Sequence, residues 1–66
     1  MSGEPEQQPA LRASDADRER VAVVLRDAAA EGRLTLEELS DRVASTYAAR
    51  TSTELEQLTR DLPAPM

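Results

Sequence analysis

A chain of 66 residues with a formal net charge of −5 can hold one small domain, near the size at which a single hydrophobic core is barely sufficient. The chain contains no cysteine and no histidine, which excludes disulfides, thiolate metal sites and histidine-based acid–base chemistry. The negative charge disfavours nucleic acid and anionic membrane surfaces as partners and favours basic or neutral ones.

The two ends of the sequence differ in composition from its middle. Residues 1–10 collect Pro, Gly, Glu and Gln without apolar periodicity, a composition typical of a disordered acidic tail, and residues 64–66 are expected to be a tail or the start of a linker. The longest apolar run covers residues 21–25, far short of the ~20 residues of a membrane span, and the N-terminus lacks the pattern of a signal peptide. We therefore expect a soluble, cytoplasmic domain over residues 11–63.

The first helix is predicted at about residues 15–31. Ser14 is a favoured N-cap, and two aspartates follow in the first turn, where the helix dipole stabilises anions. The apolar residues of this segment recur at the spacing of one buried helical face: Val21, Val24, Leu25 and Ala28. Leu11, which precedes the cap, is expected to fold back onto the first turn.

A tight turn is predicted directly after this helix. Gly32 can adopt the left-handed backbone conformation that closes a helix. Thr35 and Glu38 then have the spacing of a capping box, in which each side chain binds the other residue's backbone N–H. Leu34 and Leu36 flank that cap, and both are expected to enter the core.

The second helix is predicted at about residues 36–49. Its expected buried stripe is Leu36, Leu39, Val43 and Tyr47, again at helical spacing. Glu38 and Arg42 lie four residues apart, so an ion pair is expected between them. The ring of Tyr47, the sole aromatic residue, is expected to pack against the third helix with its hydroxyl group at the rim.

The third helix is predicted at about residues 52–61. Thr51 and Glu54 repeat the capping-box pattern, and Pro63 ends the helix. The expected apolar edge is Leu55, Leu58 and Leu62, with an ion pair between Glu56 and Arg60 on the opposite side. Because the connections between the three segments are short, consecutive helices must be neighbours, which predicts an all-α, compact three-helix arrangement.

No pattern in the sequence indicates catalysis, a metal or a cofactor. Asp15, Asp17 and Glu19 resemble the start of a calcium-binding loop, but Arg20 and Arg26 occupy the positions at which that loop needs Gly and Glu. There is no glycine-rich phosphate loop, and a bundle this small offers little room for a substrate pocket. We expect no enzyme, no cofactor and no small-molecule substrate.

Two binding functions remain open. A helix, a glycine turn and a second helix form the outline of a helix-turn-helix DNA-binding regulator, although the second helix would present acids to the phosphates. The other function is protein–protein interaction or regulation, with a protein partner or self-association. On a helical wheel Val23 lies almost opposite the core positions of the first helix, with Ala16 and Ala30 seven residues away on either side, so these three residues form a candidate partner surface.

Four short motifs, taken in order, resemble one known family. They are residues 12–19 (RASDADRE), 31–35 (EGRLT) with 38–39 (EL), 49–51 (ART) with 54–55 (EL), and 61–63 (DLP). Over residues 11–63 the chain resembles the SHOCT-like domain of unknown function, family 1707, of actinobacterial proteins, a domain often followed by membrane segments or other domains. The resemblance implies a small helical domain without established activity or functional residues. Membrane association would come only through a domain absent from this chain.

Overall fold

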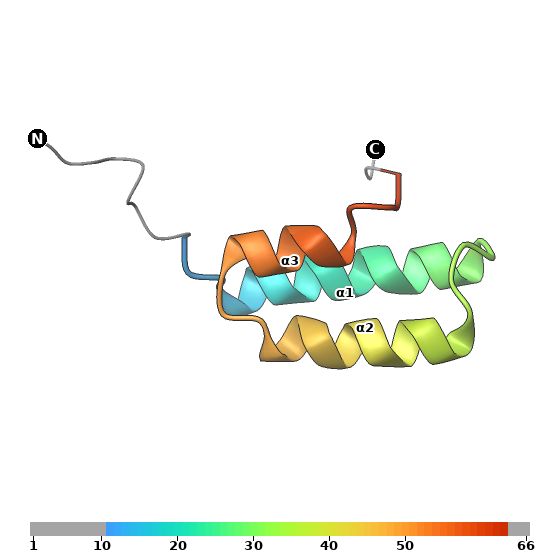
Figure 1. Cartoon of the computed structure of the whole chain (residues 1–66), viewed down its shortest axis with the longest axis horizontal. Helices are drawn as coiled ribbons and strands as arrows, with labels where there is room; N and C mark the ends of the chain where they lie inside the picture. Colours follow the sequence, from blue (N-terminus) through green and yellow to red (C-terminus); the bar gives the residue numbers. More distant parts are fainter. Residues whose placement is uncertain (1–10, 64–66) are drawn as a thin grey trace, which may run out of the picture.

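The computed structural model describes residues 11–63 and contains three α-helices in that range: α1 (Asp15–Ala30), α2 (Leu36–Ala48) and α3 (Ser52–Leu58). Figure 1 shows α1 and α2 side by side and antiparallel, with α3 returning to run beside α1 in the same direction as α1. The predicted all-α, three-helix architecture is confirmed. The tails predicted at 1–10 and 64–66 lie outside the described residues.

Each helix begins with a complete capping box. In all three boxes the N-cap hydroxyl accepts the backbone N–H of the third helical residue, whose carboxylate accepts the N-cap N–H in return. The pairs are Ser14 with Asp17, Thr35 with Glu38 and Thr51 with Glu54, at donor–acceptor distances of 2.8–3.2 Å. Because a box needs only residues three positions apart, each helix start is determined locally.

The turn after α1 is a Schellman motif centred on Gly32. Gly32 has a φ of 82° and donates its N–H to the Ala29 carbonyl at 3.0 Å, while the Arg33 N–H reaches the Ala28 carbonyl at 2.8 Å. Both bonds satisfy carbonyl groups that the end of α1 leaves without helical partners. The chain can therefore reverse direction within five residues and begin α2 at Leu36.

The core lies where α1, the turn and α2 meet. Leu25 is fully buried and is packed with Ala28 and Leu34, and the half-buried side chains around them are Val21, Ala29, Leu39, Val43 and Leu62. Leu34 and Leu39 flank the N-terminus of α2 in the positions of a hydrophobic staple. The expectation that Leu36 also enters the core is wrong. The staple consists of Leu34 and Leu39, and Leu36, at the first helical position, is 80% exposed.

Leu11 does not fold back onto the first turn of α1. Its side chain is 77% exposed. Instead its backbone forms a short antiparallel bridge with the segment before α3, where the Ser52 N–H donates to the Leu11 carbonyl at 2.8 Å and the Ala13 N–H to the Arg50 carbonyl at 2.9 Å. The bridge joins the segment before α1 to the start of α3 through main-chain atoms. A pattern of side chains in the sequence therefore cannot predict it.

The third helix is shorter than predicted. It ends at Leu58, and Thr59 adopts a non-helical conformation, whereas the prediction extended the helix to 61. Since Arg60 lies beyond that end, it cannot take the helical position that an ion pair with Glu56 requires, and no such pair forms among the described residues. Residues 59–63 instead form an irregular segment whose Leu62 packs on the core.

Candidate interaction surface

Two arginines join segments that are distant in the sequence. Arg18, on α1, is 21% exposed at its side chain and donates Nη1 to the Ala49 carbonyl at 2.8 Å and to the Ala13 carbonyl at 3.4 Å. Its other terminal nitrogen binds Asp15 at 2.9 Å. Arg18 thereby holds the connection between α2 and α3 against the start of α1.

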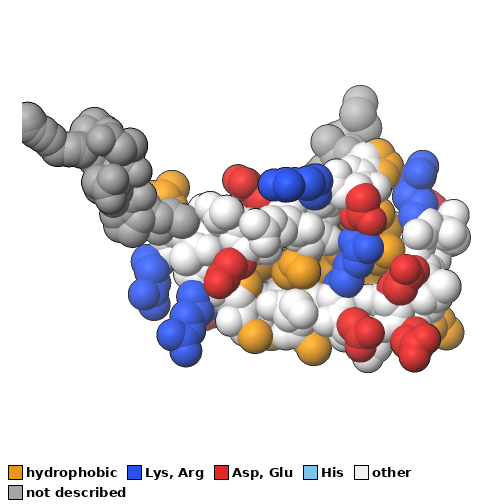
Figure 2. Space-filling view, viewed as in Figure 1, with side chains coloured by type: hydrophobic (Ala, Val, Ile, Leu, Met, Phe, Trp, Pro, Cys, Tyr) orange, Lys and Arg blue, Asp and Glu red, His pale blue; other side chains and the backbone are white. Residues whose placement is uncertain are grey.

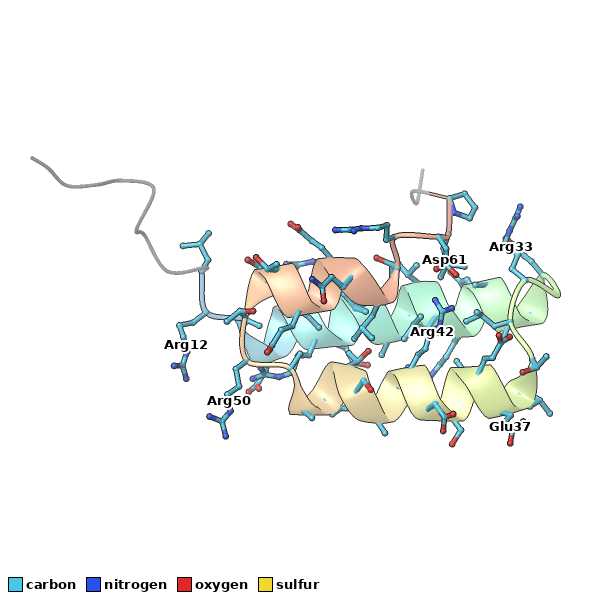
Figure 3. The ribbon with its side chains drawn as sticks, viewed as in Figure 1. Arg12, Arg33, Glu37, Arg42, Arg50 and Asp61 are labelled. Atoms are coloured by element: carbon cyan, nitrogen blue, oxygen red, sulfur yellow. The ribbon has the colours of Figure 1, made fainter. Side chains whose placement is uncertain are left out.

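Arg42, on α2, binds the other end of α3. Its guanidinium group donates to both carboxylate oxygens of Asp61, at 2.8 and 2.9 Å, and to the carbonyl of Leu58 at 3.0 Å, and Figure 3 shows the Arg42 and Asp61 side chains pointing at one another. The hydrogen bonds between these two groups lower the pKa of Asp61 and raise that of Arg42. A cation at the last carbonyl of α3 also matches the helix dipole.

The expected ion pair between Glu38 and Arg42 is therefore wrong. Glu38 is held by the backbone N–H of Thr35 in its capping box, at 2.8 Å, while Arg42 turns toward Asp61. The sequence does contain a signal for the observed arrangement. Arg42 lies three residues after the core residue Leu39, and Arg18 lies seven before Leu25, so both arginines stand on core-facing sides of their helices.

The side chain of Tyr47 contacts α1 through its hydroxyl group. Its hydroxyl group donates to Glu19 of α1 at 3.1 Å, and the residue is 49% exposed. The buried position in this part of α2 belongs to Thr46, which is fully buried and donates its hydroxyl to the Arg42 carbonyl at 2.8 Å. The core-facing side of α2 is therefore rotated by one residue from the predicted stripe at this end.

An open groove of about 520 Å³ lies between α1 and α3. It runs beside α3, between residues 17–24 of α1 on one side and residues 52–63 of α3 and the segment after it on the other. We call it the α1–α3 groove, and its lining residues are Asp17, Arg20, Val21, Val24, Ser52, Leu55, Glu56, Thr59, Leu62 and Pro63. In the view of Figure 2 the charged side chains are of both signs and interspersed.

The rim of the groove carries a carboxylate without an ion-pair partner. Arg20 is bonded to Asp17, whereas Glu56 makes no ion pair with any residue between 11 and 63. Val21 and Val24 of α1 and Leu62 are half-buried and Leu55 is buried beneath them, so the groove combines an apolar floor with one free negative charge.

The outer face of α1 contains the three residues of the predicted partner surface. Val23 is 47% exposed, and Ala16 and Ala30 are exposed. Ala16 and Val23 border one shallow apolar depression together with Val24, and Ala30 lies outside it. The structure thus brings two of the three residues to one depression and leaves the third further along the same helix.

Two of the helix-capping carboxylates have a pKa below the ordinary value. Backbone N–H groups lower the pKa of Asp17, through Ser14, and of Glu54, through Arg50 and Thr51. A carboxylate that is stabilised in its charged form is a poor general base at neutral pH. Residues 11–63 contain no cluster of ligands suited to a metal ion, and no feature of them points to catalysis.

None of the helices within residues 11–63 combines the length and the hydropathy that crossing a bilayer requires. The fold and its surfaces define a small all-α module with three capped helices and an open apolar groove. The chain belongs to the family described as the DUF1707 SHOCT-like domain, whose model matches residues 11–63.

Two relatives from Mycobacterium tuberculosis support this assignment. They are the uncharacterized protein MT0994 of strain CDC 1551 / Oshkosh and the uncharacterized protein Rv0966c of strain ATCC 25618 / H37Rv, each 52% identical over 52 residues. The match covers 79% of this chain and 26% of each relative, so the chain spans about a quarter of the length of these proteins. No solved structure matches the chain.

Proposed function

We propose that this chain is a non-enzymatic protein-binding module that receives a segment of a partner protein in the α1–α3 groove. The observation that carries the proposal is the groove itself, which is lined by apolar side chains and stays open between α1 and α3. Apolar surface that remains exposed in a folded domain is typical of interaction sites. A regulatory role would follow if the bound segment belonged to a protein whose activity depends on the contact.

The chemistry of the groove specifies the bound segment. Its floor of valine and leucine side chains fits one or two apolar side chains, as an amphipathic helix presents them. The carboxylate of Glu56 on the rim fits a lysine or arginine next to those side chains. The net charge of −5 also favours a basic partner. We therefore expect a segment that combines an apolar anchor with at least one basic residue.

The arrangement of the helices supports a protein ligand over DNA. In a helix-turn-helix the two helices cross at ~90–120°, which frees the second for the major groove. Here α1 and α2 lie antiparallel along their lengths (Figure 1), and the exposed residues at the start of α2 include Glu37, Glu38 and Asp41. These acids would face the phosphates with like charge.

The proposal is tested by photocrosslinking in the native host. A photoreactive amino acid at Thr59, which lines the groove, should capture a protein, whereas the same group at Ala44, exposed on α2, should not. The captured segment is then made as a peptide and titrated into isotope-labelled protein. Shifts of the amide signals of Val24 and Leu55 support the groove.

Two results would contradict the proposal. One is equal capture from positions 59 and 44, since a specific site cannot lie on both surfaces. The other is a peptide whose binding shifts only signals of α2. The variant Glu56→Lys should weaken peptide binding, because it reverses the charge on the rim. It should leave the helical circular-dichroism signal unchanged, because Glu56 is exposed and makes no ion pair among the described residues.

A further inference from the structure

The outward face of α1 carries a charge pattern centred on Val23. At about 100° per residue, Val21 and Leu25 lie about 200° from Val23, so the exposed Val23 side chain points away from the core. Neither α2 nor α3 covers it, as its 47% exposure shows. We call the strip along this direction the Val23 face, and it contains Ala16, Glu19, Arg20, Val23, Arg26, Asp27 and Ala30.

The four charged residues of the Val23 face form two opposite-sign pairs. Glu19 and Arg26 project about 40–60° to one side of Val23, and Arg20 and Asp27 about the same angle to the other side. Along the helix axis, Glu19 and Arg20 stand about 6 and 4.5 Å before Val23, and Arg26 and Asp27 about 4.5 and 6 Å after it. All four are exposed.

This pattern complements itself under a two-fold rotation. We propose that a second copy of this chain binds the Val23 face in the antiparallel direction, with Val23 against Val23. This rotation reverses positions along the helix axis. The Glu19–Arg26 side of one copy therefore faces the Glu19–Arg26 side of the other copy, and the Arg20–Asp27 sides face one another in the same way. Glu19 then meets Arg26 of the second copy, and Arg20 meets Asp27 of the second copy, each with an axial offset of about 1.5 Å.

Charges on this face are incompletely paired within one chain. Glu19 and Arg26 are seven residues apart, a rise of about 10.5 Å, and their charged groups reach only 3.8 Å from one another. Asp27 makes no ion pair with any other residue of the 11–63 segment. Within one chain Glu19 also accepts the Tyr47 hydroxyl and Arg20 binds Asp17. In the antiparallel dimer Arg26 and Asp27 each gain an opposite charge at nearly the same axial height, namely Glu19 and Arg20 of the second copy.

The ends of the face allow close approach. Ala16 of one copy meets Ala30 of the other, and two alanines let the helix backbones come near one another while Val23 fills the centre. A parallel pairing would also join opposite charges, namely Glu19 with Arg20 and Arg26 with Asp27 of the other copy. It would align the two helix dipoles, however, so the antiparallel arrangement is favoured.

We expect the dimer to be weak. A contact between single helices buries less than the ~1,200 Å² of a standard stable interface. We expect a dissociation constant on the order of 100 µM. In a longer protein that carries this domain, a second contact elsewhere would raise the effective affinity. The proposal is separate from the groove, with which the Val23 face shares only Arg20.

The test is sedimentation equilibrium of the whole chain from about 10 µM to about 1 mM. The wild type should dimerise, and Val23→Glu should remain monomeric, because it would place two carboxylates at the centre of the contact. Glu19→Arg and Arg26→Glu should each weaken the dimer by about tenfold, since each turns two attractions into repulsions. Asp41→Arg, a charge reversal on exposed α2, is the control and should dimerise no more weakly than the wild type.

An equimolar mixture of Glu19→Arg and Arg26→Glu distinguishes the two directions. In the antiparallel dimer the new arginine at position 19 meets the new glutamate at position 26, so the mixture should regain wild-type affinity. In a parallel dimer it meets Arg20, and affinity stays low. A monomeric wild type at 1 mM, a failure of the mixture to recover, or equal weakening by Asp41→Arg would overturn the proposal. Circular dichroism of each variant establishes that the helices persist.

Discussion

Substitution of Gly32 separates the cost of backbone conformation from the cost of a steric clash. Gly32 has a φ of 82°, and a β-carbon built there meets no atom within 4 Å. The space is therefore free, and the whole penalty comes from holding an L-residue in the left-handed region, ~1–2 kcal/mol. A smaller gain from restricting the unfolded chain offsets part of it. We expect Gly32→Ala to cost about 1 kcal/mol and the β-branched Gly32→Val about 2 kcal/mol.

Thermal denaturation followed by circular dichroism measures this difference. For a domain of this size, 1 kcal/mol lowers the melting temperature by ~4–8 °C, so Gly32→Ala should melt about 5 °C and Gly32→Val about 10 °C below the wild type. Gly32→Asn is the graded control and should fall between glycine and alanine, because asparagine tolerates left-handed geometry. Equal melting temperatures across the series would refute the argument that Gly32 is required for its conformation.

Three further outcomes follow from the core and the ion pairs. Leu25→Ala, at a fully buried site, should cost ~3–5 kcal/mol in urea denaturation, and a loss below 1 kcal/mol would mean that the site is loosely packed. Arg42→Gln should speed amide hydrogen exchange around Asp61 while leaving that of α1 unchanged, because it releases the segment after α3. The pKa values of Asp17, Glu54 and Asp61 are lowered in the folded chain, so these groups add to the free energy of unfolding at pH values above their ordinary pKa values of 3.8 (Asp) and 4.5 (Glu). The melting temperature should stay level from pH 8 to about 5 and fall as these groups protonate in stronger acid.

Features that depend on near neighbours in the chain could be predicted from the sequence. Each helix start needs only a hydroxyl residue and a carboxylate three positions later, and the end of α1 needs only a glycine that accepts positive φ. These signals predicted three helices and their order. On the candidate surface, the helical period alone placed Val23 opposite Val21 and Leu25, and its exposure agrees.

Features that depend on the relative placement of helices could not be predicted in the same way. An arginine has several carboxylates within reach of its long side chain, and only the packing of α3 beside α1 and α2 brings Asp61, rather than Glu38, to Arg42. The α1–α3 groove likewise depends on how α3 and the segment after it pack beside α1.

The sequence by itself determined where each helix begins and which face of α1 is apolar, because those properties arise from residues within one or two helical turns. The tertiary structure decided which carboxylate Arg42 binds and which helix the Tyr47 hydroxyl contacts. In both cases several partners lie within reach of one long side chain, and only the placement of the neighbouring helices selects one of them.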